Sequence, residues 1–175
     1  MILKDGSTVL LRWQSSNPKK EEASRFMRFI NSLVKDKEYI LMDKQTPLKA
    51  EKKWVKEGCE RIRNNELLRL IAEKDKNIIG ICDAARGKWK EKGNVTLGVS
   101  VAKEFRGKGL GTALLRIIIK EAKRKWKPEN IVLAYIEGND PAKRLYEKLG
   151  FRKFAVFPRW VKHRGRYKNV IWMRL

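Results

Sequence analysis

Apolar and polar positions along the chain repeat with two periods, which predict an alternation of strands and helices. Alternating or unbroken apolar runs, typical of strands, lie at 7–13, 67–74, 78–86, 95–101, 131–136, 151–157 and 167–175. Apolar residues three and four positions apart, typical of amphipathic helices, lie at 17–34, from 47 onward, at 110–126 and at 140–149. The short run at 39–42 is predicted to be extended.

Residues that favour helix ends support these boundaries. Asn17-Pro18 is predicted to open the first helix, and Thr46-Pro47 the second, with the threonine as N-cap and the proline in the first turn. Asp140-Pro141 is predicted to do the same for the last helix, which Gly150 ends.

The order of these elements predicts an α/β protein with one central mixed sheet and helices on both faces. The strands at 67–74 and 78–86 are joined by a tight turn, so they are predicted to pair antiparallel. The segment from 95 to 157 alternates strand and helix, which requires crossovers and therefore some parallel pairing. No repeat or linker divides the chain, so residues 1–175 are predicted to form a single domain.

Composition and charge narrow the class of protein. Hydrophobic residues make up 42% of the chain and charged residues 35%, which argues against disorder. No apolar run is long enough for a membrane span, and the first residues do not resemble a signal peptide, so we expect a cytoplasmic protein. The single histidine and the distant Cys59 and Cys82 match no metal-ligand spacing, so no metal is expected.

The net charge points to an anionic partner. The chain has 42 lysine and arginine residues against 20 aspartate and glutamate residues, a formal charge of +22. Such a surface attracts nucleic acid, phosphorylated cofactors or acidic membranes, although no membrane partner is expected here.

Three glycines between a predicted strand and a predicted helix carry the first functional signal. Gly107, Gly109 and Gly111 follow the strand at 95–101 and precede the helix at 110–126. Backbone N–H groups at a helix N-terminus attract phosphate, and glycine lets the phosphate approach them closely. The stretch lacks the Gly-Lys-Ser/Thr of a Walker loop. It also has Thr112 where the dinucleotide fingerprint needs glycine, so both motifs are rejected.

What remains resembles the GNAT superfamily of N-acetyltransferases. The acetyl-CoA loop of that family reads Arg/Gln-x-x-Gly-x-Gly/Ala, met here by Arg106, Gly109 and Gly111. Its second signature, Asn-x-x-Ala-x-x-Leu-Tyr-x-x-Leu-Gly-Phe, is matched by the stretch from Asn139 to Phe151. The resemblance implies a three-layer fold with a mixed, mostly antiparallel sheet. A bulge in the fourth strand would splay that strand from the fifth. The acetyl-CoA-binding core would span about 67–157.

The resemblance also implies site residues. Acetyl-CoA would be bound by the fourth strand, the glycine loop and the last helix. The residues concerned are Val99, Ser100, Val101, Arg106, Gly107, Lys108, Gly109, Leu110, Gly111, Thr112, Asn139 and Tyr146. Tyr146 would also protonate the leaving thiolate as a general acid. A glutamate that serves as base in some relatives is replaced by Ala134, so Glu137, Asp83 and His163 are alternative candidates, with Glu137 first.

Two functions follow. The first is acetyl-CoA-dependent transfer of an acetyl group to a primary amine by direct attack, the amine being a protein α-amine, a ribosomal protein or a small molecule. An α-amine, with a pKa of about 7.7 to 8.0, is far more often neutral at pH 7 than a lysine amine at about 10.4, which favours the former. The alternative is a catalytically silent member of this fold that binds nucleic acid or the ribosome through tracts such as 158–169. A monomer or homodimer is expected.

Overall fold

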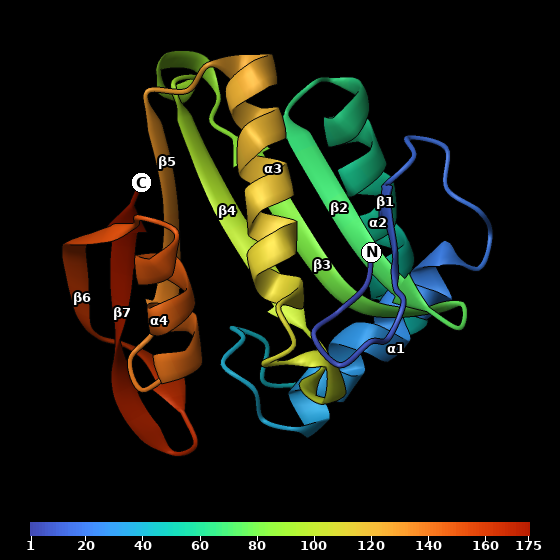
Figure 1. Ribbon diagram of the computed structural model, residues 1–175, viewed down its shortest axis with the longest axis horizontal. Coiled ribbons are helices and arrows are strands. Elements are labelled where there is room, and N and C mark those ends of the chain that lie inside the picture. The colour runs from blue at the N-terminus through green and yellow to red at the C-terminus, as the bar shows by residue number, and fades with distance from the viewer.

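The apolar periods of the sequence become a seven-stranded sheet in the computed structural model, which describes residues 1–175 (Figure 1). The strand order is β1-β2-β3-β4-β5-β7-β6. The strands are β1 (Leu10–Trp13), β2 (Leu67–Lys74), β3 (Asn77–Arg86), β4 (Asn94–Val101), β5 (Asn130–Ile136), β6 (Arg152–His163) and β7 (Arg166–Arg174). The helices are α1 (Glu22–Lys35), α2 (Leu48–Arg63), α3 (Leu110–Trp126) and α4 (Asp140–Lys148), with short 3-10 turns at Trp89–Glu91 and Lys103–Phe105.

Helices cover both faces of the sheet, as predicted. In Figure 1, α3 and α4 cross the near face, whereas α1 and α2 lie behind it. The larger core cluster, with 22 buried residues, includes Leu114 and Ile118 of α3 packed on the sheet. A second cluster of 8 buried residues joins Phe26 of α1 and Val55 of α2 to the opposite face. No helix has the length and apolar character needed to span a membrane.

Strand pairing confirms a mixed sheet that is mostly antiparallel. Every neighbouring pair is antiparallel except β4 and β5, which are parallel because α3 carries the chain back across the sheet. The parallel pairing is short, from Asn94↔Asn130 to Leu97↔Leu133. Beyond it, β4 pairs only with β3, and β5 pairs only with β7. The two strands therefore separate at their C-terminal ends.

The expected bulge in β4 is absent. The register between β3 and β4 runs from Arg86↔Val95 to Gly80↔Val101 without a shift. The two strands part after Leu97↔Leu133, while β4 stays paired with β3 and β5 stays paired with β7.

Several helix starts differ from the predicted ones. The first helix begins at Glu22 rather than near Asn17, whose backbone N–H donates to the Ser15 hydroxyl instead. The second begins at Leu48, with Pro47 as N-cap. Thr46 precedes the cap, its side chain makes no capping hydrogen bond, and its backbone N–H donates to Asn31 Oδ1 at 2.8 Å. Residues 39–42 form no strand, and the first three of them are bends.

The last helix is capped by Asn139 instead of Asp140. Its side-chain Oδ1 accepts a hydrogen bond from the backbone N–H of Ala142 at 3.3 Å, and Asp140 is the first helical residue. This bond fixes the orientation of the Asn139 side chain.

Candidate active site

The loop between β4 and α3 presents a row of free backbone donors. None of the backbone N–H groups of residues 107–112 donates a hydrogen bond within the chain. Gly107 and Gly109 have φ angles of +72° and +90°, values that favour glycine and turn the chain into the helix. Free backbone N–H groups at a helix N-terminus attract anions, so this row is suited to an anionic ligand.

Gly111 allows the two helices of the near face to approach each other. A Cβ atom at this position would lie 3.2 Å from Leu145 Cδ2 of α4. The glycine therefore brings the N-terminus of α3 next to α4, across the gap between β4 and β5.

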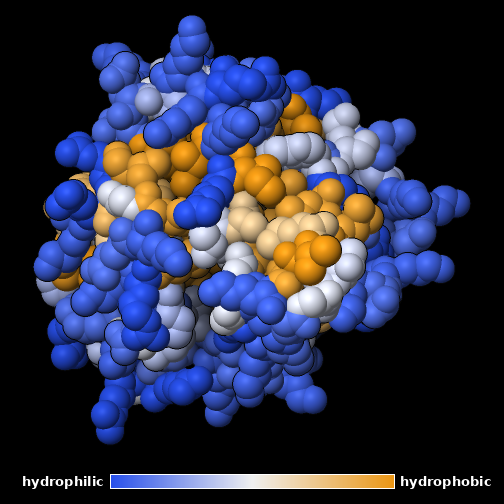
Figure 2. Space-filling view, viewed as in Figure 1, coloured by the Kyte–Doolittle hydropathy of each residue, from blue (hydrophilic) through white to orange (hydrophobic).

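The loop opens into a cavity of about 1560 Å³. Apolar residues form a band across the middle of this face of the molecule, surrounded by polar ones (Figure 2). Most predicted cofactor residues line the cavity, namely Val99, Ser100, Val101, Arg106, Gly107, Gly109, Gly111, Thr112, Asn139 and Tyr146. Two do not. The Lys108 ammonium contacts Asp5 Oδ2 at 2.8 Å, and the Leu110 side chain is buried in the core, so each offers only its backbone N–H.

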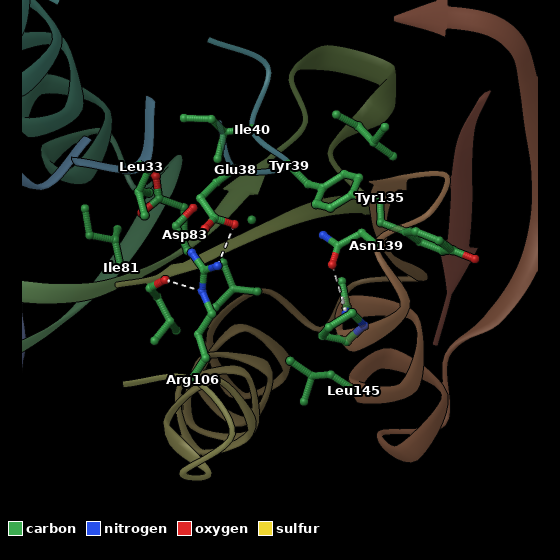
Figure 3. Close-up of a pocket in the computed structure, with 18 of the residues that line it drawn as sticks. Leu33, Glu38, Tyr39, Ile40, Ile81, Asp83, Arg106, Tyr135, Asn139 and Leu145 are labelled. Atoms are coloured by element: carbon green, nitrogen blue, oxygen red, sulfur yellow. Dashed lines mark hydrogen bonds and ion pairs between the residues drawn. The ribbon is translucent and has the colours of Figure 1, made fainter. Parts of the chain in front are cut away.

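Arg106 ties the glycine loop to the connection between α1 and α2. Its Nη1 contacts Glu38 Oε2 at 2.5 Å, and its Nε donates to the carbonyl of Val101 at 2.9 Å (Figure 3). The guanidinium therefore holds the loop in place through two protein partners.

Tyr146 lies in the cavity with a hydroxyl that has no partner in the chain. The residue is only 6% exposed, yet its hydroxyl is not among the fully enclosed polar atoms that lack a hydrogen bond, so it reaches the open cavity. Burial raises the pKa of Tyr146, and the neighbouring Cys82 acts in the same direction. The phenol is therefore a protonated donor throughout the neutral range.

The three candidate bases have different surroundings. Glu137 is exposed, lies outside the cavity and accepts from the backbone N–H of Asn169 at 3.5 Å. Asp83 lines the cavity, but both of its oxygens accept from Arg69 at 2.7 Å. His163 lies outside the cavity lining, and Ala134, which replaces the glutamate of some relatives, lies within it.

His163 contacts the cavity wall from outside, through Tyr39. Its ring stacks on Tyr39 with centroids 4.4 Å apart, and Arg164 Nη2 donates to the carbonyl of Lys37 at 3.3 Å. The β6–β7 hairpin thereby contacts the connection between α1 and α2. Burial lowers the pKa of His163, and Arg164 and Lys168 lower it further, whereas Glu38 opposes them.

Sequence reasoning missed a residue on this side of the cavity. Glu51 of α2 lines the cavity and is only 6% exposed. It lies on the buried stripe of its helix together with Val55 and Cys59. An acidic residue on an apolar helix face is the signal that would have revealed it, because buried carboxylates without partners are unfavourable.

The arrangement can hold an extended anionic molecule and a cation at opposite ends. Free N–H groups and a positively polarised helix terminus face one end, and carboxylates lie near the other. The unpaired edge of β4 lies between them.

Comparisons with known proteins find acetyltransferases. A model of the acetyltransferase (GNAT) family matches residues 27–151. An N-alpha-acetyltransferase of Sulfurisphaera tokodaii is 31% identical over 108 residues, covering 55% of this chain and 64% of the relative. One of Saccharolobus solfataricus is 42% identical over 65 residues, covering 37% and 38%. The chain thus matches less than two thirds of the length of either relative.

A solved structure extends the likeness to nearly the whole fold. The ribosomal-protein-alanine N-acetyltransferase from Brucella melitensis superposes with a TM-score of 0.78 at 22% identity, covering 95% of this chain and 98% of that one.

Proposed function

Because the chain belongs to the acetyltransferase (GNAT) family, we propose that it transfers an acetyl group from acetyl-CoA to a primary amine. The observation that carries this proposal is the row of free backbone N–H groups at residues 107–112, which borders the gap between β4 and β5. When bound, acetyl-CoA supplies an acetyl group activated as a thioester.

The residues present fit such a molecule. Its diphosphate and ribose phosphate carry about four negative charges, which suit the free N–H groups and the N-terminus of α3. The free edge of β4 at Val99 and Val101 offers backbone hydrogen bonds to the pantetheine arm, with Ser100 between them. Asn139 has its Oδ1 engaged by Ala142, which leaves its amide N–H₂ to donate into the cavity.

Tyr146 would supply a proton to the departing thiolate. Its hydroxyl faces the cavity without a protein partner, and its raised pKa keeps it protonated. Because that pKa lies well above about 8.5 for a thiol, the phenol acts mainly by donating a strong hydrogen bond as sulfur charge develops.

The acceptor is proposed to be a protein α-amine. The relatives named as N-alpha-acetyltransferases support this choice. About 10% of an α-amine is neutral at pH 7, against about 0.04% of a lysine amine, so an α-amine needs less help from a base.

The test uses labelled acetyl-CoA with matched peptides that have either a free α-amine or an acetylated N-terminus and an internal lysine. We expect the α-amine peptides to be acetylated faster, whereas a clear preference for lysine would overturn the choice of acceptor. The absence of any acetyl-CoA effect on the melting temperature of the folded chain would overturn the enzyme itself.

A second candidate function, binding of nucleic acid, is favoured by the C-terminal hairpin. Its segment 151–175 has no acidic residue. Its basic residues are Arg152, Lys153, Arg159, Lys162, Arg164, Arg166, Lys168 and Arg174. Exposed aromatic rings lie among them, with Trp160 at 66% and Tyr167 at 56% exposed. Cations interleaved with aromatic rings favour single-stranded nucleic acid. RNA retention that falls steeply with salt is the expected result, and retention that does not change with salt argues against it.

A further inference from the structure

The acids that line the cavity are Glu38, Glu51 and Asp83, and we call their part of the lining the acceptor side. One of these carboxylates has no partner. Glu51, in the first turn of α2, is only 6% exposed, and its carboxylate makes no hydrogen bond or ion pair in the chain. The fully enclosed polar atoms that lack a partner are Arg25 Nη2 and His163 Nε2, so the Glu51 oxygens are not sealed in the protein. Since Glu51 lines the cavity, its carboxylate opens into it.

The cation nearest to Glu51 is already engaged. Arg69 of β2 donates to both oxygens of Asp83 and, through Nη1, to Gln14 Oε1 at 3.1 Å. Its guanidinium also lies 3.7 Å from the ring centroid of Trp54. Arg69 therefore acts on Glu51 through its charge but forms no ion pair with it.

The charges that line the cavity are segregated. Two acids of the acceptor side are neutralised, Asp83 by Arg69 and Glu38 by Arg106, which leaves Glu51 as the acid without a counter-ion. The other basic residues that line the cavity belong to the opposite end. They are Arg116 of α3, Arg144 and Lys148 of α4, and Lys4, whose Cγ would lie 3.8 Å from a Cβ at Gly109. In a chain with a formal charge of +22, an unpaired buried acid at one end of the cavity marks a place for a cation.

We propose that Glu51 accepts a proton from the incoming ammonium group, directly or through one water, and so makes the amine nucleophilic. This role rests on the proposed function and assigns the general base of that reaction. Glu137 is too exposed and lies outside the cavity, and Asp83 is held by two hydrogen bonds from Arg69, so neither is placed to act.

The proposed step balances in protons and electrons. The ammonium gives one proton to Glu51, and the nitrogen lone pair then forms a bond to the thioester carbonyl carbon. The carbon–sulfur bond breaks, and its electron pair leaves with the sulfur. The nitrogen loses a second proton, which balances the proton that the thiolate receives, and Glu51 later releases its proton to solvent.

The surroundings of Glu51 suit a base. Burial raises the pKa of Glu51, whereas the charge of Arg69 opposes this shift. A raised pKa lies closer to the pKa of the amine, which favours proton transfer between them. The charge that acts on it comes from Arg69 of β2. Asp83 from β3, together with Glu38 and Arg106, also lines the cavity. The residues of α1 in the cavity lining are apolar: Phe26, Phe29, Ile30 and Leu33.

The test compares Glu51→Gln with Glu57→Gln, an exposed acid on the same helix that lies 3.9 Å from Lys53. For an α-amine peptide at pH 7, Glu51→Gln is expected to lower kcat/KM about 100-fold, and Glu57→Gln to leave it within about twofold. At pH 9 most of the α-amine is already neutral, so the difference in kcat/KM between Glu51→Gln and the unaltered protein should become about tenfold smaller. The melting-temperature increase with acetyl-CoA should be the same in all three proteins.

Other outcomes separate the two proposals. Activity of Glu51→Gln within threefold of the unaltered protein, or a deficit that does not change with pH, overturns the role of Glu51 and leaves the enzyme intact. An unaltered protein that acetylates no amine overturns both. If the amide variant does not fold, Glu51→Asp retains the charge but withdraws it by one methylene. The kcat/KM of Glu51→Asp should then be at least tenfold lower, with an unchanged melting-temperature increase on addition of acetyl-CoA. Full activity of this variant would contradict the proposal.

Discussion

The two ends of the cavity are built from different parts of the chain. The cofactor end consists of main-chain N–H groups in one continuous loop, held by glycines with positive φ angles and by the start of α3. The acceptor end consists of side chains from separate elements, including Glu51 of α2, Asp83 of β3 and Tyr39 between α1 and α2. A main-chain site depends on local conformation, whereas a side-chain site depends on how distant elements pack.

The largest effect is expected from forcing a side chain into the main-chain end. Gly109→Val places a β-branched residue at φ +90°, which costs about 1–3 kcal/mol of strain and moves the free N–H groups. Acetyl-CoA binding, measured by calorimetry, should weaken about 100-fold or more. Gly165→Val is the matched control, because φ is +79° there and nothing lies within 4 Å of the added Cβ. It should lose stability but still bind acetyl-CoA, and equal loss of binding in both variants would show that strain alone is responsible.

An intermediate effect is expected where the two ends meet, at Tyr146. Tyr146→Phe removes the hydroxyl that faces the cavity and should lower kcat about 10- to 100-fold with little change in acetyl-CoA affinity. Tyr135 is the control, since its hydroxyl points away from Asn139 in Figure 3. Tyr135→Phe should retain most of kcat. If single-turnover rates instead fall for Tyr135→Phe and not for Tyr146→Phe, the acid has been assigned to the wrong ring.

The smallest effect is expected at the contact between His163 and Tyr39. The pKa of His163 is lowered in the folded protein, so the folded state binds fewer protons than the unfolded state, and stability falls as the pH drops through the ordinary histidine range. His163→Phe keeps a ring that can stack on Tyr39 but cannot titrate. Between pH 7.5 and 5, the melting temperature of the unaltered protein should fall more than that of this variant. If the two melting temperatures fall in parallel, His163 is not the cause of the loss.

The same contrast explains what the sequence could predict. The turn of the loop into α3 was predictable because Gly107, Gly109 and Gly111 satisfy a local conformational demand and therefore leave a compact pattern. The α3 boundaries, Leu110–Trp126, were predicted correctly for the same reason. Asn139 and Tyr146 lie in one helical signature, so their presence in the cavity could also be predicted.

The features that could not be predicted from the sequence depend on contacts between distant residues. Arg106 was predicted to bind the cofactor, but the sequence does not show that Glu38 would hold its guanidinium. Strand β6 extends past the predicted end at 157, because the pairing with β7 resumes after a shift between Phe157 and Val161 that interrupts the alternation. Glu51 was not identified because no motif places it, and its importance follows only from the absence of a partner in three dimensions.

The row of free N–H groups at residues 107–112 has a consequence for how such a protein diverges. Every amino acid except proline supplies the same backbone donor, so substitutions outside the glycines can accumulate in this loop without abolishing its contacts. The opposite end has no such redundancy, because a side-chain exchange on α2 changes the chemical groups that line it. Descendants of one ancestral gene can therefore acquire new acceptors while they inherit the same donor molecule.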